Sequence, residues 1–107
     1  MIQRGVIVAR IKPGQEGHVA ALFAASDAGE LPALAGVRHR SLYALGDVYV
    51  HLVEVEGDVG EAVADVRDHP LFRELSEKLR PYIEPYDPAT WRSPKDAMAQ
   101  RFYSWDA

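Results

Sequence analysis

The sequence predicts an α+β protein whose strands and helices follow the order β-α-β-β-α-β, and two observations carry this prediction. Two extended runs, residues 37–45 and 48–55, are separated only by Gly46 and Asp47, which suits a two-residue hairpin turn. Stretches with apolar residues at helical spacing lie before and after this hairpin. The order is that of the ferredoxin-like fold, in which four antiparallel strands form one sheet and the helices cover one face.

The elements before the hairpin are a strand and a helix. Residues 5–11 are rich in β-branched side chains and end at a Lys-Pro-Gly turn, so we expect the first strand there. From residue 15 to about Asp27 the pattern changes to helical spacing among several alanines, which predicts the first helix. Residues 31–35 are expected to form a loop or a single turn that ends at Gly36.

The elements after the hairpin are helical until the chain reaches Pro81. Residues 59–67 predict a second helix, and His69 followed by Pro70 resembles a cap and first-turn proline that open a further helix. Residues 82–86 can supply a short fourth strand, which its prolines confine to a sheet edge. Residues 87–107 form a C-terminal extension with an aromatic tail. We expect the tail aromatics to pack in the core, with closure of a pocket or a dimer seam as the alternative: Phe102, Tyr103 and Trp105.

Length and composition limit the classes of function. The chain has 107 residues, which predicts a single domain over residues 1–107. It carries 16 acidic and 12 basic side chains, so the basic surface of a nucleic-acid or anionic-membrane binder is not expected. There is no cysteine, which excludes disulfides and thiolate metal sites and suits a reducing cytoplasm. No signal-peptide pattern or long apolar run is visible, so a soluble, cytoplasmic protein is expected.

The hairpin predicts which side chains share a face of the sheet. If Gly46 and Asp47 form the turn, Leu42 lies opposite His51, and Arg40 is the diagonal neighbour of His51. Both faces of the hairpin are largely apolar, so we expect helices on one face and a second copy of the chain on the other, giving a homodimer. The expected members of the face that carries His51 are Arg38, Arg40, Leu42, Ala44, Tyr49, His51, Val53 and Val55.

An arginine and a histidine in the middle of covered strands are destabilising unless the space around them is wet or holds a ligand. Asp27 continues the apolar stripe of the first helix, so Asp27, Arg40 and His51 are expected to converge on one pocket. Such a trio suits proton transfer on a carbonyl compound, with a satisfied ion-pair network as the alternative. No HxH or HxxxH spacing predicts a metal site. Further side chains expected to line the pocket are Phe23, Ser26, Leu42 and Tyr49.

Five segments of the chain, in this order and spacing, resemble the tetracenomycin-type aromatic polyketide cyclases. They are Glu30-Leu31-Pro32, Gly36-Val37-Arg38-His39-Arg40, Asp47-Val48-Tyr49-Val50-His51-Leu52-Val53-Glu54, His69-Pro70-Leu71-Phe72 and Phe102-Tyr103-Ser104-Trp105. The resemblance implies a ferredoxin-like, dimeric α/β-barrel type of protein with no cofactor. It also implies a bacterial type II polyketide pathway, with a poly-β-keto intermediate as substrate and acyl carrier protein or other synthase components as candidate partners.

The resemblance also implies roles for the trio. The histidine and arginine implicated in the family match His51 and Arg40, and its acidic residue at the end of the first helix matches Asp27. Our hypothesis is that His51 is the general acid and base, that Arg40 stabilises the enolate or alkoxide, and that Asp27 orients an active-site group or takes the carbon-bound proton. Related sequences often have a histidine where this chain has Ser26, so His51 is the only well-placed imidazole. The activity implied is aldol-type cyclisation with loss of water. The alternatives are a cofactor-free anthrone-type monooxygenase and a non-catalytic polyketide-binding component.

Overall fold

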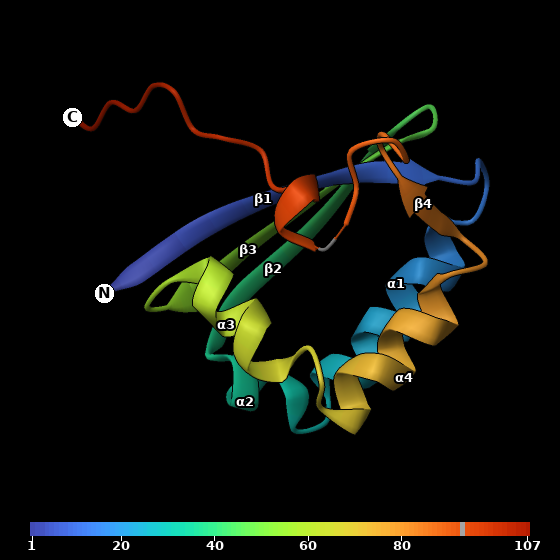
Figure 1. The fold of residues 1–107 in the computed structure, drawn as a ribbon, viewed down its shortest axis with the longest axis horizontal. Helices are drawn as coiled ribbons and strands as arrows, with labels where there is room; N and C mark the ends of the chain where they lie inside the picture. Colours follow the sequence, from blue (N-terminus) through green and yellow to red (C-terminus); the bar gives the residue numbers. More distant parts are fainter. Residues whose placement is uncertain (93) are drawn as a thin grey trace.

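A computed structural model describes residues 1–92 and 94–107 and contains an antiparallel sheet with helices on one face (Figure 1). Its four strands lie in the order β2-β3-β1-β4, as the ferredoxin-like prediction requires. The strands are β1 (Ile2–Ile11), β2 (Val37–Leu45), β3 (Val48–Glu56) and β4 (Ile83–Pro85). The helices are α1 (Glu16–Asp27), α2 (Leu31–Ala35), α3 (Val59–Val66) and α4 (Pro70–Leu79), followed by a short 3-10 helix (Pro94–Ala97).

The predicted hairpin register is confirmed at its turn end and wrong at its far end. Leu42 pairs with His51 and Arg40 with Val53, as expected. Beyond them a β-bulge shifts the register, so Val37 and not Arg38 lies opposite Val55. The expected place of Arg38 among the helix-covered residues is therefore wrong. The bulge buries an aliphatic side chain at the core and leaves the arginine exposed, which avoids the cost of desolvating an unpaired cation.

The helices form two pairs below the sheet. In Figure 1, α1 and α4 lie side by side near one end, and α2 and α3 lie near the other, as their contacts also show. Helix α2 ends at Gly36, whose φ of 71° lies in the left-handed region that favours glycine. Helix α4 begins after His69, whose Nδ1 accepts a hydrogen bond from the Leu71 amide over 3.1 Å. The predicted helix boundaries are therefore confirmed within a residue or two.

The core between sheet and helices consists of two clusters of buried side chains. One joins β1, β3 and α1 and includes Phe23 and Tyr49, and the other joins β3 to α3 and includes Val55 and Val59. Helix α3 approaches the sheet closely because Gly5 lies beneath it. These clusters hold α1 and the central strands in place, and the polar groups between them are positioned by that packing.

Among the described residues, the opposite face of the sheet is only partly covered, because the segment after β4 lies against Val8 of β1. Val6, Val8, Val50 and Leu52 are half-buried there, and the nearby Leu45 is 84% exposed. The chain after the 3-10 helix pairs with the free edge of β1 at one point, where the Ala99 amide donates to the Val6 carbonyl.

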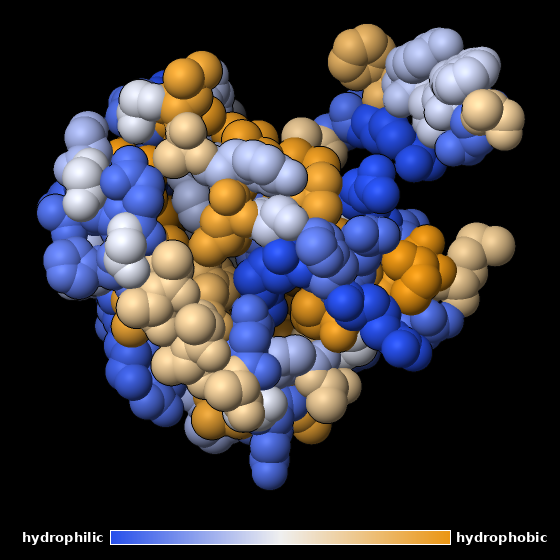
Figure 2. Space-filling model, turned by 180° about the vertical axis from the view of Figure 1, so that it is seen from behind, coloured by the Kyte–Doolittle hydropathy of each residue, from blue (hydrophilic) through white to orange (hydrophobic). Residues whose placement is uncertain are grey.

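The C-terminal tail then leaves the body of the protein (Figures 1 and 2). Phe102 is 97% exposed, Tyr103 74% and Trp105 72%. The expectation that these aromatic side chains pack in the core is therefore wrong for the single chain. The reason is that the segment runs off the sheet edge, where no second layer of the same chain is available to cover it.

Candidate active site

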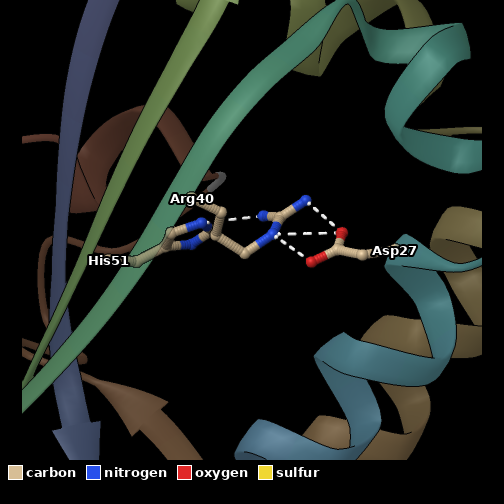
Figure 3. Close-up of polar contacts among 3 residues, drawn as sticks. All are labelled: Asp27, Arg40 and His51. Carbon is tan, nitrogen blue, oxygen red and sulfur yellow. Dashed lines mark hydrogen bonds and ion pairs between the residues drawn. The ribbon is translucent and has the colours of Figure 1, made fainter.

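The site lies on the helix-covered face of the sheet, where three elements meet. Arg40 comes from β2 and His51 from β3, and their register places them diagonally next to each other. Asp27 is the last residue of α1 and follows the buried Phe23 by four residues, which puts both on one face of the helix. Figure 3 shows the three polar side chains pointing toward one another, so the predicted convergence of Asp27, Arg40 and His51 is what the structure has.

Asp27 and Arg40 form an ion pair of the side-on type. Nε of Arg40 donates to Oδ2 of Asp27 over 3.0 Å, and Nη2 donates to Oδ1 over 2.9 Å. The Arg40 side chain is 14% exposed and that of Asp27 36%, so solvent reaches the pair from the carboxylate side. Two parallel hydrogen bonds to one edge of the guanidinium fix its orientation more tightly than a single contact does.

His51 is a hydrogen-bond acceptor in this arrangement. Its Nε2 lies 2.8 Å from Nη1 of Arg40, and because a guanidinium has only donors, Nε2 must accept (Figure 3). The imidazole is therefore neutral, with its proton on Nδ1. The pKa of His51 is lowered to about 4, first by burial and second by the Arg40 cation, while the Asp27 carboxylate acts in the opposite direction.

Phe23 packs against both basic groups. The guanidinium carbon of Arg40 lies 4.9 Å from the centre of the phenyl ring, a cation–π distance. The ring centre of His51 lies 5.2 Å from the same phenyl ring in an edge-to-face arrangement. One helix thus supplies the carboxylate for an edge of the guanidinium and the aromatic surface for its face.

The other predicted pocket residues lie around this trio with different environments. Tyr49 is buried two positions before His51 on β3, 6.3 Å between ring centres, and burial raises the pKa of its hydroxyl. Leu42 packs against the core beside the site. Ser26 is half-buried next to Asp27, but its hydroxyl is not part of the hydrogen-bonded trio. The roles of all these residues stay predictions.

The described residues hold no cluster of three or more side chains suited to a metal ion. None of the helices in the described part is long and apolar enough to cross a membrane. A hollow of about 260 Å³ lies away from the trio, between β1 and the segment after β4, where the sequence predicts only a C-terminal extension. Tyr86, at the end of the predicted fourth strand, and Trp91, in the extension, line the hollow, and their aromatic side chains were the available signal that this segment contacts the body of the protein.

The fold and the site together define a class: a ferredoxin-like α+β protein with an arginine-centred polar site between sheet and helices. The sequence matches the family described as polyketide synthesis cyclase over residues 3–106. The chain belongs to this family of enzymes.

Relatives from Streptomyces cover nearly the whole chain. An uncharacterised protein of Streptomyces coelicolor is 53% identical, covering 94% of this chain and 92% of the relative. Polyketide synthase CurG of Streptomyces cyaneus is 49% identical, with 98% of each chain covered. Tetracenomycin F2 cyclase of Streptomyces glaucescens is 43% identical, covering 100% of this chain and 97% of that protein.

Two solved structures resemble this one. The structure of tetracenomycin F2 cyclase, described as a type-II polyketide cyclase, superposes with a TM-score of 0.90 and covers 98% of both chains. A putative antibiotic biosynthesis monooxygenase of Chloroflexus aurantiacus has a TM-score of 0.59 at 14% identity, covering 81% of this chain and 86% of that one. The second likeness concerns the fold alone. The predicted family and fold class are thereby confirmed.

Proposed function

We propose that this polyketide cyclase closes a ring in a poly-β-keto intermediate of type II polyketide biosynthesis by an aldol-type addition followed by loss of water. The observation that carries the proposal is the Asp27–Arg40–His51 chain of hydrogen bonds on the helix-covered face of the sheet. Arg40 is a fixed cation beside a carboxylate, and an aldol reaction needs a base and a positive group for the oxygen anion that forms.

Asp27 is the base in this proposal. Among the described residues, its Oδ2 accepts only from Nε of Arg40, so lone pairs remain for a ligand, and the side chain is accessible. Asp27 takes a proton from a carbon between two carbonyl groups. The electron pair of that C–H bond moves onto a carbonyl oxygen, and Arg40 stabilises the resulting enolate.

Ring closure and dehydration use the same groups. The enolate carbon attacks a second carbonyl carbon of the same molecule, a C–C bond forms, and the second oxygen becomes an alkoxide that takes the proton back from Asp27. The hydroxyl group then leaves with a neighbouring carbon-bound proton, releasing one water and leaving a C=C bond. Holding one reactive geometry of a flexible poly-β-ketone also excludes wrong ring closures.

His51 holds Arg40 in this proposal. The sequence predicts His51 as general acid and base; we propose a holding role instead, because Nε2 accepts from Arg40 and a pKa of about 4 makes the imidazole a weak base. As a neutral acceptor it fixes Nη1 of the guanidinium from the sheet side. Asp27 fixes the opposite side, and the two contacts together set the direction in which Arg40 points.

The protein acts as a homodimer in this proposal. The half-buried valines and Leu52 of the open sheet face are one apolar region that a second copy can cover, and the exposed aromatic side chains of the tail are another. The absence of cysteine from the sequence suits the cytoplasm as its location. Acyl carrier protein or other synthase components complete the set of proposed partners.

The test is to incubate the protein with the poly-β-ketone made by a minimal polyketide synthase, under air and under nitrogen, and to identify the products by mass and NMR. A new ring pattern with loss of water, formed equally in both atmospheres, supports the cyclase reaction. An added oxygen atom that appears only under air overturns it in favour of a monooxygenase. Binding without acceleration over the spontaneous reaction overturns it in favour of a binding component.

A further inference from the structure

The guanidinium of Arg40 has donors that the protein does not use. A guanidinium carries five N–H groups. Asp27 accepts from Nε–H and from one N–H of Nη2, and His51 accepts from one N–H of Nη1. Among the described residues, none accepts a hydrogen bond from the second N–H of Nη1 or from the second N–H of Nη2. One donor therefore remains on each terminal nitrogen.

The remaining donors are held in a fixed plane. Asp27 occupies the edge formed by Nε and Nη2, so the outer edge between Nη1 and Nη2 faces away from the carboxylate (Figure 3). Phe23 covers one face of the same plane at 4.9 Å. The fork requires that His51 accepts from the Nη1 hydrogen on the Cδ side, which leaves the outer hydrogens of Nη1 and Nη2 parallel. Such a planar, immobilised pair suits a ligand with two oxygens in one plane and is poorly matched to a single carbonyl oxygen.

Charge distinguishes between the two ligand classes that carry such a pair of oxygens. A carboxylate ligand carries a negative charge, and the Asp27 carboxylate, which already neutralises Arg40, would repel it. An enolised β-diketone arrives neutral and becomes an anion only when its proton moves to a base. The site, with a paired cation and a neutral His51, therefore favours the β-diketone.

We propose that the outer edge of Arg40 binds both oxygens of an enolised β-diketone unit, so that Arg40 selects which pair of neighbouring carbonyl groups of the substrate enters the site. This inference rests on the proposed function and specifies its substrate recognition. A polyketide carries many such units, and Arg40 then fixes the position of ring closure through the one unit that it holds.

The experiment uses probes that cannot cyclise. Benzoylacetone carries a β-diketone, and butyrophenone has the same skeleton with one carbonyl group. Calorimetric titration of the wild-type protein should show benzoylacetone binding at least about tenfold more tightly than butyrophenone, because it makes an additional hydrogen bond to a charged donor. Equal affinities overturn the proposal, and this comparison requires no variant.

Two further probes test geometry and charge. Dimedone is a β-diketone whose ring holds the two oxygens apart, and it should bind no better than butyrophenone. Phenylbutyrate offers a carboxylate on a similar skeleton and should bind more weakly than benzoylacetone. If dimedone binds as tightly as benzoylacetone, the fork is not the recognition element, and if phenylbutyrate binds more tightly, the site recognises carboxylates.

Variants locate the effect at Arg40. Arg40→Lys keeps the charge and loses the planar fork. The ratio of its affinities for benzoylacetone and butyrophenone should therefore fall close to one. The matched control is Arg38→Lys, an exposed arginine on the same strand, which should keep the wild-type preference. Retention of the preference in Arg40→Lys, or its loss in Arg38→Lys, overturns the assignment.

The outcome is independent of the cyclisation assay. A protein that shows the preference but forms no ring from the poly-β-ketone fails as a cyclase and keeps the β-diketone site. A protein that forms the ring but shows no preference keeps the proposed function and loses this inference. The absorption of bound benzoylacetone gives a second readout, since its enolate absorbs at longer wavelength than its neutral enol.

Discussion

Arg40 and His51 are joined by a hydrogen bond in which the cation is the donor and the imidazole the acceptor, over 2.8 Å. Protonation of His51 on Nε2 would break this bond and place two positive groups in contact under the phenyl ring of Phe23. The pair therefore works as a unit with one positive charge, which Asp27 balances. The predictions below test this unit and the scaffold that holds it.

The stability of the protein should depend on His51 in acid. Its pKa in the folded protein is about 4, below the ordinary value of 6.5. As pH falls through this window the unfolded chain binds a proton that the folded protein does not, so the free energy of unfolding decreases, by up to about 3 kcal/mol. Urea unfolding of wild type and His51→Gln, repeated at steps of about 0.5 pH between pH 7.5 and pH 4, measures how the free energy of unfolding of each protein changes with pH. Parallel curves for the two proteins, or an equal effect of the exposed His39→Gln, contradict the prediction.

The choice of substitution at His51 should separate a holding role from acid–base catalysis. In His51→Gln the amide oxygen can still accept from Arg40, so we expect kcat to stay within about tenfold of wild type. In His51→Leu the Nη1 donor has no acceptor, and the loss should be larger. Cyclisation kinetics with the poly-β-ketone measure both. If His51→Gln is as inactive as His51→Leu, the imidazole transfers the proton itself.

Removal of the carboxylate at the end of α1 should reduce the rate of chemistry. Asp27→Asn keeps the size of the side chain and removes the base, so kcat should fall by about 100-fold or more. Benzoylacetone should still bind to this variant but as the neutral enol, which its absorption reports. Asp65→Asn, on the exposed side of α3, is the matched control. Unchanged kcat in Asp27→Asn would remove the base from the proposed mechanism.

A charge on the open sheet face should dissociate the proposed homodimer. Val50 is half-buried in the central part of that face, so Val50→Glu places a carboxylate where a second copy would pack. Sedimentation equilibrium should give twice the mass of one chain for wild type and the mass of one chain for the variant. The Tm should change little. Ala64→Glu on the exposed side of α3 should remain dimeric. A monomeric wild type at all concentrations contradicts the proposal.

A methyl group at Gly5 should destabilise the contact between β1 and α3. A Cβ there would lie 2.7 Å from Cγ1 of Val59 and 3.1 Å from its Cγ2. Gly5→Ala should therefore lower the free energy of unfolding by about 1–3 kcal/mol, and Gly5→Ala/Val59→Ala should lose less than the sum of the single changes. Gly17→Ala in α1 meets no atom within 4 Å and should be neutral or stabilising. If the losses of free energy in Gly5→Ala and Val59→Ala simply add in the double variant, the contact between β1 and α3 at Gly5 is not tight.

The part of the site on the hairpin could be predicted from sequence because one turn determines it. Gly46 and Asp47 fix the register of β2 against β3, and the register fixes the neighbourhood of Arg40 and His51. Asp27 followed from its spacing after Phe23 on one helix. These are local relationships, and periodicity in the sequence is sufficient to express them.

The features that were not predicted depend on contacts between segments distant in sequence, which a periodic pattern does not contain. The bulge near Val37 results from burying an aliphatic side chain in preference to Arg38, which no periodic pattern reveals. The acceptor role of His51 depends on which ring nitrogen lies nearest to Arg40. The exposed position of Trp105 depends on where the chain leaves the sheet edge.

The bulge in β2 has a consequence for insertions and deletions. Arg40 and His51 are placed by counting from the hairpin turn, and the bulge lies on the far side of Arg40. A residue gained or lost before the bulge, near Gly36, can be absorbed there without moving Arg40. A residue gained or lost at the turn instead slips one strand against the other and turns either Arg40 or His51 to the opposite face. Length variation among homologues is therefore tolerable in the segment around α2 and damaging at the two-residue turn.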